Sequence, residues 1–306
     1  MPARRQRRRK SAPKRRFFKF YFLVFIFLIL GFYFIFKRPT NLWDGETRLS
    51  LVAQKQSGDV VLVSFDPAAE SIVQIEIPGS TEAQVASGLG TWRLSSVTKL
   101  GKQENLKGAI LAETIVKTFQ IPVEAWGEEG VLGFASPNSL DVLRATFANY
   151  QTNLSFWDKV NLAFFGMSIK RGDRTSLNLV DTGYIYKTNL VDGEGYQKRQ
   201  KIPATVTSIF ADSAIAEEAL QVAVINASGN PALSQGVAAT IEVMGAKVVS
   251  VKNLPAAEED CRVAGSSSLT KREIAVIFSC TEKSGDSLAG DFDIEVFLGS
   301  AFGARF

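Results

Sequence analysis

The side-chain types in this 306-residue sequence limit the chemistry that it can perform. The sequence contains no histidine. This absence excludes Ser-His-Asp and Cys-His nucleophile systems, histidine-ligated zinc and histidine-based pH switching. Catalysis would therefore depend on carboxylates, lysine, arginine, tyrosine or a divalent metal bound by oxygen.

The cysteines, Cys261 and Cys280, restrict sulfur chemistry. Two thiols are too few for a Cys₄ or Cys₃His zinc site. Both follow a predicted membrane segment, in the part of the chain expected outside the cytoplasm, where disulfides form and persist. They are predicted either to form a disulfide, which would contribute on the order of 3 kcal/mol, or to remain a pair of inert buried thiols.

One turn has the position of a phosphate site but lacks its motif. Residues 226–229 (Asn-Ala-Ser-Gly) lie between a predicted strand and a predicted helix N-terminus, where phosphates often bind. The turn matches neither G-x-G-x-x-G nor G-x-x-x-x-G-K-[ST], and no lysine stands nearby in the sequence. An ordinary turn without a ligand is the simpler interpretation.

The N-terminal residues predict a membrane anchor. Ten basic residues lie between Arg4 and Lys19, followed by an uncharged apolar run from Phe20 to Phe36. This run is near the lower limit for crossing a hydrocarbon core of roughly 30 Å. The cations before it predict a cytoplasmic N-terminus and an extracytoplasmic remainder. No small residues suited to signal cleavage follow, so we expect an uncleaved signal anchor in the cell membrane, with the lipid bilayer as a partner.

Outside this anchor the chain is acidic. Residues 39–306 hold 23 Lys and Arg against 31 Asp and Glu, a net charge of −8. Such a surface predicts no nucleic-acid partner. The basic arm is interpreted as an orienting and lipid-attracting segment instead. The sequence thus divides into a basic cytoplasmic arm (1–19), a transmembrane helix (20–36), a linker (37–45), an α/β domain (46–210), a hinge (211–219) and a C-terminal domain (220–306).

The first domain begins with three β-type runs, Arg48–Ala53, Asp59–Phe65 and Ser71–Ile77. The last two flank a turn sequence and predict an antiparallel hairpin. We expect a looser stretch over 81–103 and a strand at 176–180.

Helices are predicted over Asn105–Gln120 and Ser139–Tyr150, the second with Ser139 as its N-cap. Trp157–Met167 is apolar and aromatic. It is interpreted as a core helix with Trp157, Leu162 and Phe165 packed inward. The alternative is an amphipathic surface that faces a membrane.

The C-terminal domain has the clearest local signals. A strand at 220–225 is followed by a helix with Asn230 as N-cap and Pro231 at its first position. Gly245 ends that helix, and a strand at 246–251 follows. Strand, helix and strand predict a βαβ unit with parallel strands. Further strands are expected at 273–279 and 292–298, and the whole is predicted to be a mixed α/β fold.

Two segments together resemble a known family of envelope proteins. Val222–Leu233, the helix after it, Gly245 and Val251–Asn253 resemble the C-terminal domain of LytR-type proteins, which opens with Val-x-Val-x-Asn-Gly-Ser/Thr-Gly. Ala227 stands where glycine is usual. Further matches resemble the LytR-CpsA-Psr (LCP) domain: Gly58–Pro67, Ile75–Pro78 and Phe119–Glu124. The order of anchor, LCP domain and C-terminal domain is also that of the family.

The resemblance implies a link to glycopolymer transfer from a polyprenyl diphosphate carrier onto the cell wall. In family members, arginines and aspartates hold the diphosphate and a divalent metal, and Asp59 occupies the place of a family acidic residue. The chain departs from this pattern. The family sequence Ile-Pro-Arg-Asp-Thr is replaced at 77–81 by Ile-Pro-Gly-Ser-Thr, Lys-x-Asn by Arg93-Leu94-Ser95, and only Lys198-Arg199-Gln200 remains of an arginine-rich stretch.

We therefore expect a non-catalytic binding or scaffolding protein of the cell envelope that engages cell-wall glycopolymer or envelope proteins. No cofactor is expected for it. The alternative is an active transferase with a rearranged site, in which Asp59, Asp66 and Arg93 are the candidate catalytic groups and magnesium assists. A third interpretation is that the basic arm carries signals inward.

Overall fold

The first sheet is built on an antiparallel hairpin. The computed structural model describes residues 21, 25–26, 41–106, 108–283 and 291–306. In it β2 (Val60–Asp66) pairs antiparallel with β3 (Ser71–Ile77) along their whole length. The hairpin predicted from the sequence is therefore confirmed.

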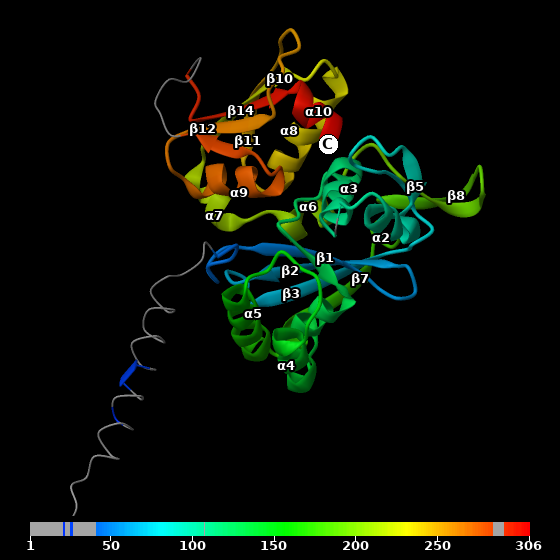
Figure 1. Cartoon of the computed structure of the whole chain (residues 1–306), viewed down its shortest axis with the longest axis vertical. Coiled ribbons are helices and arrows are strands. Elements are labelled where there is room, and N and C mark those ends of the chain that lie inside the picture. Colours follow the sequence, from blue (N-terminus) through cyan, green and yellow to red (C-terminus); the bar gives the residue numbers. More distant parts are fainter. Residues whose placement is uncertain (1–20, 22–24, 27–40, 107, 284–290) are drawn as a thin grey trace, which may run out of the picture. The chain divides into compact units, whose positions relative to one another are not determined.

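Three more strands complete this sheet, in the order β6-β1-β2-β3-β7 (Figure 1). β1 (Leu49–Gln54) is antiparallel to β2, and it matches the first predicted run. The edge strands β6 (Ala125–Glu128) and β7 (Arg174–Asn178) run parallel to their neighbours. The sheet is therefore mixed, and the strand expected at 176–180 begins two residues earlier.

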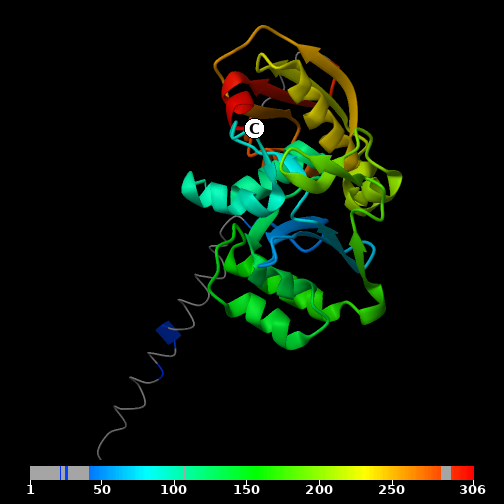
Figure 2. The same ribbon diagram turned by 90° about the vertical axis from the view of Figure 1, so that its right-hand side faces the viewer.

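Alternation along the strands gives this sheet two apolar faces, because successive side chains point to opposite sides. Val52 and Leu62 belong to a cluster with side chains from α2 (Leu94–Gln103) and α3 (Ala109–Phe119). Their neighbours in sequence belong to a cluster on the other face, which includes side chains of η1 (Glu129–Ala135), α4 (Ser139–Phe147) and α5 (Phe156–Ser168). Figures 1 and 2 show these two groups of helices on opposite sides of the strands.

The stretch expected to be loose, 81–103, is ordered. It forms β4 (Glu82–Gln84), β5 (Thr91–Arg93) and α2. Leu94, Val97 and Gly101 of α2 are buried, at spacings of three and four residues. Gly101 lies on the buried side of the helix, where it requires no space for a side chain.

Both helices predicted in this domain exist but are shorter than expected. α3 begins at Ala109 because Asn105 has a φ of 58°, a left-handed conformation that an α-helix does not contain. α4 ends at Phe147 and has Asn138 as its N-cap, not Ser139 as predicted. The side chain of Asn138 accepts a hydrogen bond from the backbone N of Leu140 at 3.1 Å. Asn and Ser are comparable N-caps, so the sequence alone does not choose between them.

The apolar run at 157–167 forms most of α5, which begins with a capping box between Ser155 and Asp158. Leu162 is fully buried, as predicted, whereas Trp157 and Phe165 are only partly buried. Phe164 is 68% exposed. One side of α5 therefore belongs to the core and the other is exposed.

The segment that joins the two predicted domains is largely helical. A hairpin of β8 (Ile185–Leu190) and β9 (Gly193–Lys198) precedes α6 (Ala204–Phe210). The predicted hinge, 211–219, contains α7 (Ser213–Glu218), with the Asp212 side chain accepting a hydrogen bond from the backbone N of Ala214. Its role as a hinge stays a prediction.

The second sheet contains the predicted βαβ unit. β10 (Gln221–Ala227), α8 (Pro231–Val243) and β11 (Lys247–Asn253) follow one another, and the two strands are parallel. Asn230 is the N-cap, and Gly245 just beyond the helix has a φ of +109°. All three features confirm the sequence-based prediction, because each depends on local turn and capping chemistry.

The other elements of this sheet include one correction. Residues 273–279 were expected to be a strand, but most of them lie in α9 (Leu269–Ile277). The buried residues Ile274, Ile277 and Phe278 have helical spacing, and Ser268 caps the helix, which outweighs the β-propensity of the isoleucines. The strand expected at 292–298 is present as β14 (Ile294–Gly299).

The sheet order is β11-β10-β14-β12-β13, with both parallel and antiparallel pairs. β12 (Cys261–Gly265) and β13 (Thr281–Lys283) form one edge, and α10 (Ser300–Arg305) follows β14. A disulfide joins Cys261 to Cys280 beside this edge.

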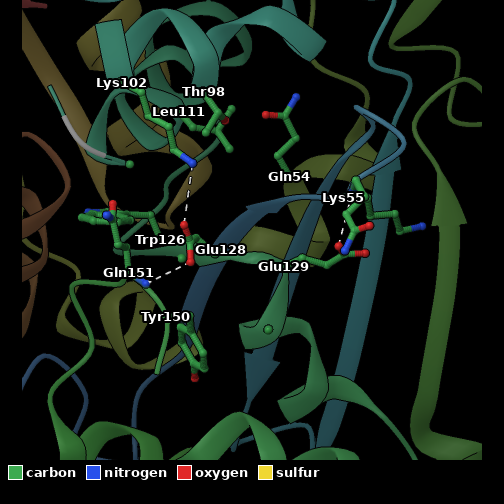
Figure 3. Close-up of a pocket in the computed structure, with 14 residues that line it drawn as sticks. Gln54, Lys55, Thr98, Lys102, Leu111, Trp126, Glu128, Glu129, Tyr150 and Gln151 are labelled. Atoms are coloured by element: carbon green, nitrogen blue, oxygen red, sulfur yellow. Dashed lines mark hydrogen bonds and ion pairs between the residues drawn. The ribbon is translucent and has the colours of Figure 1, made fainter. Parts of the chain in front are cut away.

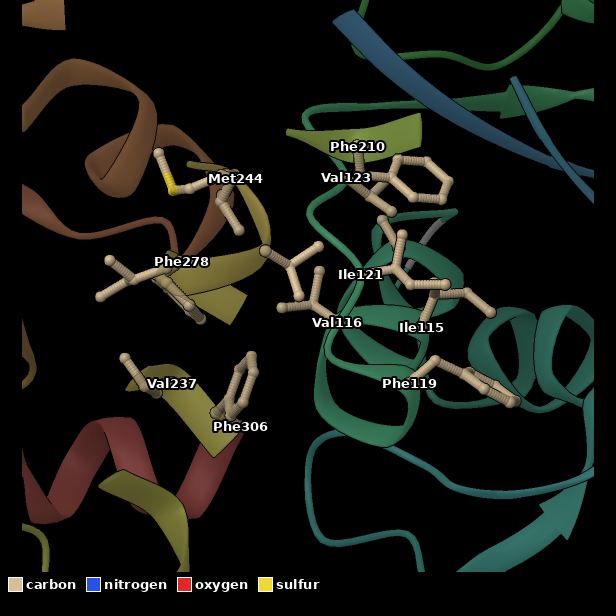
Figure 4. Close-up of a cluster of buried hydrophobic side chains, with 14 of the residues drawn as sticks. Ile115, Val116, Phe119, Ile121, Val123, Phe210, Val237, Met244, Phe278 and Phe306 are labelled. Carbon is tan, nitrogen blue, oxygen red and sulfur yellow. The ribbon is translucent and has the colours of Figure 1, made fainter. Parts of the chain in front are cut away.

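Residues 42–306 form one compact unit. A single apolar cluster includes Val116 of α3 and Phe210 of α6 together with Met244 and Phe278 of the C-terminal part (Figure 4). The core is therefore continuous across the segment that was predicted to separate two domains.

The predicted arm and nearly all of the predicted span lie outside the described residues; of the span, only Tyr21, Phe25 and Ile26 are described. Within the described part of the chain, no helix has both the length and the apolar character needed to cross a membrane.

Candidate functional site

Asp59, the first candidate catalytic residue, caps the open end of the β2–β3 hairpin. Its Oδ1 accepts a hydrogen bond from the backbone N of Gly79 at 2.8 Å. Its Oδ2 accepts one from the Ser57 hydroxyl at 2.9 Å. The next contact links Gly79 O to the backbone N of Ser95 at 2.9 Å. Asp59 thus lies at the same edge of the molecule as the segment that contains Arg93.

Asp66 lies at the opposite end of the same strand. Its carboxylate pairs with the guanidinium of Arg48 and accepts a hydrogen bond from the backbone N of Ala69 at 3.1 Å. Asp66 lies seven residues after Asp59 in the sequence, which corresponds to about 23 Å at 3.3 Å per residue of strand. The structure therefore does not bring the two aspartates together.

Arg93 is held by the tip of the β8–β9 hairpin. Its guanidinium makes two hydrogen bonds to the Asp192 carboxylate, at 2.6 and 2.7 Å, and a third to Glu194 O at 2.9 Å. This bidentate contact raises the pKa of Arg93 and lowers that of Asp192. The catalytic roles of Asp59, Asp66 and Arg93 stay predictions, and in this structure all three groups bind other parts of the chain.

A pocket of about 390 Å³ lies beside the C-terminal end of β1, between α2 and β6 (Figure 3). We call it the α2–β6 pocket. It collects residues from five separate stretches of sequence, none of which was predicted to contribute to a site. Its lining residues include Gln54, Lys55, Gln56, Thr98, Lys102, Gly108, Leu111, Trp126, Glu128, Glu129, Gly130, Tyr150 and Gln151.

Two aromatic side chains of the pocket are seated against glycines. A Cβ atom at Gly108 would lie 2.3 Å from a ring carbon of Trp126, and one at Gly130 would lie 2.9 Å from a ring carbon of Tyr150. A larger residue at either glycine would therefore displace the ring. The Tyr150 hydroxyl also donates to Ala145 O, and Lys159 Nζ lies 4.0 Å from the centre of its ring. Burial raises the pKa of Tyr150, so this hydroxyl stays protonated.

Both lysines of the pocket are paired with glutamates. Lys55 Nζ lies 2.8 Å from a carboxylate oxygen of Glu76, and Lys102 Nζ lies 3.8 Å from one of Glu128. Glu129 accepts a hydrogen bond from the backbone N of Gln56 at 3.3 Å. The described lining residues thus include two lysines and two glutamates. This composition provides little excess positive charge for an anionic ligand.

The remaining polar groups are neutral. Gln56 and Gln151 offer amides and Thr98 offers a hydroxyl, each able to donate and accept hydrogen bonds. The Gln54 amide already donates to Gly58 O at 3.0 Å and to Leu94 O at 3.2 Å. Together with two fixed aromatic rings, these groups suit a ligand that has both apolar C–H faces and many hydroxyls.

The predicted turn at 226–229 satisfies its own polar groups. Asn226 is 2% exposed and its amide donates to Asn230 O at 2.9 Å and to the Asn253 side chain at 2.8 Å. Its side-chain oxygen accepts from Ser228. These contacts agree with the interpretation of an ordinary turn.

The most strongly perturbed carboxyls lie outside the pocket. Burial, reinforced by the proximity of Glu273, raises the pKa of Glu124 to about 8. Burial raises the pKa of Glu273 to about 7 despite its ion pair with Arg272 at 3.0 Å. Asp212 and Asp44 also face this group, and Arg272 bridges to Asp44 at 3.1 Å. Glu124 accepts a hydrogen bond from the backbone N of Ser50 and immediately precedes β6, so this cluster supports the strand that carries Trp126.

Comparisons with known proteins give only a distant relation. No protein-family model matches the chain, and no curated protein matches it. Among solved structures, TagT of Bacillus subtilis is similar over 54% of this chain and 89% of its own, with 15% identity and a TM-score of 0.38. TagV of B. subtilis matches over 51% and 92%, with 10% identity and a TM-score of 0.38. Lin1025 of Listeria innocua matches over the same shares, with 11% identity and a TM-score of 0.37.

A further structure of TagT, described as a LytR-CPS2A-psr family protein with bound octaprenyl pyrophosphate lipid, matches with 14% identity and a TM-score of 0.37. The chain thus has a distant structural similarity, over about half its length, to LCP proteins.

Proposed function

We propose that this protein is anchored in the cell membrane by its N-terminal segment and binds cell-wall glycopolymer in the α2–β6 pocket without transferring it. The anchor and the extracytoplasmic location rest on the charge pattern of residues 1–38. The link to wall glycopolymer rests on the LCP-like and LytR-like sequence segments. The pocket supplies the binding site for this proposal.

The main support for the proposal is that two aromatic rings packed against glycines line the same pocket as neutral hydrogen-bonding groups. A sugar ring presents C–H groups on its faces and hydroxyls around its edge. Trp126 and Tyr150 match the faces, and the polar side chains of Gln56, Thr98 and Gln151 match the hydroxyls. Because both rings are held in place before the ligand arrives, little conformational entropy is lost on binding.

The charges of the pocket favour binding over transfer. Cleavage of a diphosphate builds up negative charge that cations or a metal must stabilise. The pocket does contain lysines beside carboxylates, as a transferase would require. However, Lys55 and Lys102 are already paired with glutamates, and Arg93 is paired with Asp192. These carboxylates offset the positive charge that would attract a diphosphate.

Binding can be measured by calorimetry on the full chain in lipid nanodiscs, with soluble, uncharged glycan strands released from cell wall. Trp126→Ala is expected to weaken binding at least about tenfold, which corresponds to about 1.4 kcal/mol. Trp92→Ala is the matched control, because Trp92 is 48% exposed and does not line the pocket. Gln151→Ala, an exposed change that leaves both rings in place, is expected to weaken binding by a smaller factor. Unchanged affinity in both pocket variants would refute the proposal.

Catalysis is tested separately with a polyprenyl diphosphate-linked oligosaccharide and Mg²⁺. The proposal predicts no release of polyprenyl phosphate. Release that Asp59→Ala abolishes would establish the transferase alternative instead.

A further inference from the structure

Six large apolar side chains are exposed on α4 and α5. We call them the outer face. On α4 they are Leu140, Leu143 and Phe147, exposed by 61, 43 and 71%; on α5 they are Phe156, Phe164 and Met167, exposed by 54, 68 and 45%. Soluble proteins seldom expose so many large apolar side chains on adjacent elements without a partner for them.

These side chains form one continuous surface. On each helix their spacing of three, four, eight or eleven residues places them on one side. The rings of Phe147 and Phe156 lie 6.4 Å apart and join the end of α4 to the start of α5. Gly166, near the end of α5, lies beside Val142, near the start of α4. The two helices therefore run antiparallel, which places Phe164 and Met167 next to the first turns of α4.

The outer face is separate from the face that packs on the sheet. Val142 and Ala145 of α4, and Leu162 and Ala163 of α5, are buried in the core. Each helix is thus apolar on two sides. A helix that only covers a sheet requires one apolar side, so the second requires another explanation.

The chain enters the folded unit next to α5. The backbone N of Trp43 donates to Asp158 Oδ1 at 3.0 Å, and Asn161 donates to Trp43 O at 3.4 Å. The Trp43 ring contacts that of Phe165 at 5.7 Å. Six residues lead from Phe36, the end of the predicted span, to Leu42. Even fully extended they reach only about 21 Å, about the length of α5 itself.

Cations border the outer face. Residues 138–174 hold five Lys and Arg against three Asp, in a chain whose residues 39–306 carry a net −8. Of the aspartates, Asp158 is buried in the capping box of α5. Lys170 and Arg171 are exposed just after α5. The Arg144 side chain on α4 is 78% exposed and lies 3.5 Å from the carboxylate of Asp141, an exposed ion pair of little strength that leaves the guanidinium accessible. Cations at the edge of an apolar helical surface attract anionic lipid headgroups.

We propose that the outer face lies on the anionic lipid surface of the bilayer that holds the predicted span. The phenylalanines, leucines and methionine enter the headgroup boundary, while Arg144, Lys170 and Arg171 contact lipid phosphates. This contact makes the membrane a second support for the folded unit, in addition to the tether at Trp43. The proposal depends on the predicted anchor and is independent of the α2–β6 pocket.

The test places an environment-sensitive fluorophore on a cysteine at the outer face of the full chain, with the native disulfide intact. Phe164→Cys is the test variant, and Leu140→Cys repeats it on the other helix. Val191→Cys is the control, because Val191 is fully exposed at the turn between β8 and β9. Each protein is reconstituted at one copy per nanodisc with phosphatidylglycerol and brominated lipid.

Brominated lipid is expected to quench emission at positions 164 and 140 at least about twofold and to leave position 191 unchanged. Equal quenching at all three positions, or no quenching at 164 and 140, would overturn the proposal. A second set of discs is loaded with two copies each, and a blue shift that appears only in that set would assign the face to a second copy instead. Far-UV circular dichroism of each labelled variant checks that it is folded.

Discussion

The α2–β6 pocket and the outer face of α4 and α5 both present aromatic side chains to solvent, but they differ in what surrounds those rings. In the pocket, Gly108 and Gly130 seat the rings, and glutamines with paired charges surround them. On the outer face, none of the atoms nearest to a Cβ added at a described glycine belongs to the exposed phenylalanines, and Arg144, Lys170 and Arg171 lie at its edge. Aromatic side chains therefore suit a ligand of defined shape in the pocket and a fluid lipid surface at the outer face.

The difference is one of preorganisation. A ring fixed against backbone loses little freedom when a ligand arrives, and its neighbours select for orientation. A ring that projects freely is stabilised by burial in any apolar environment. Selectivity for a partner then depends on the charges at the edge of the apolar surface. The comparison predicts that changes in local geometry affect the pocket strongly and the outer face weakly.

The largest expected effect is a dependence on pH, which should alter the α2–β6 pocket and leave the outer face unchanged. Glu124, beside β6, has a pKa of about 8 and Glu273 one of about 7, against 4.5 for an unperturbed glutamate. Between pH 4.5 and about 8, the folded chain therefore binds more protons than the unfolded chain. The free energy of unfolding falls as the pH rises through this interval. Denaturant titrations should show a decrease on the order of a few kcal/mol. Glycan affinity should fall with it, because Glu124 supports the strand of Trp126.

Lipid quenching at the outer face should stay constant over the same pH range. Glu124→Gln removes one titrating group and should flatten the stability profile. A variant profile as steep as that of the wild type would show that Glu124 is not responsible.

The next effect concerns the seat of Trp126. Gly108→Ala places a Cβ within 2.3 Å of the indole, so the ring must move. We expect a loss of about 1–3 kcal/mol in the free energy of unfolding and a clear loss of glycan affinity. Gly172→Ala is the control, because nothing lies within 4 Å of its added Cβ and its φ is not positive. Unchanged glycan affinity in Gly108→Ala would contradict the idea that a fixed ring defines the pocket.

The smallest effect is expected at the outer face. Phe164→Ser should change the free energy of unfolding by no more than about 0.5 kcal/mol, because the side chain is 68% exposed. The same variant should reduce lipid quenching of a label at position 140 and leave glycan binding unchanged. A stability loss above about 1 kcal/mol would mean that Phe164 packs in the core after all.

Elements defined by local chemistry could be read from the sequence. Asn230, Pro231 and Gly245 each act within a few residues, and the βαβ unit between β10 and β11 follows from them. α9 was misread as a strand because its isoleucines favour β-structure in isolation, whereas burial of Ile274, Ile277 and Phe278 on one side favours a helix. Tertiary packing decided this case, and packing is not visible in propensity.

The α2–β6 pocket could not be predicted because its members are far apart in sequence. Gln54 and Tyr150 meet only after β6 has joined β1 in parallel and the loop after α4 has returned to it. The resemblance directed attention to Asp59, Asp66 and Arg93, each of which binds another part of the chain in the structure. The glycines that contact the two rings, Gly108 and Gly130, give no local signal, because isolated glycines are common in many turns.

The position of β1 has a mechanical consequence. This strand begins six residues after Trp43, where the chain attaches to α5, and its C-terminal end at Gln54 lines the pocket. It is hydrogen-bonded on both sides, to β2 and to β6. Force applied between the predicted anchor and a polymer of the proposed kind in the pocket would therefore act along the strand, so that all of these hydrogen bonds resist together instead of breaking one after another. A protein stretched between a membrane and a wall under tension would gain resistance to force from that single strand.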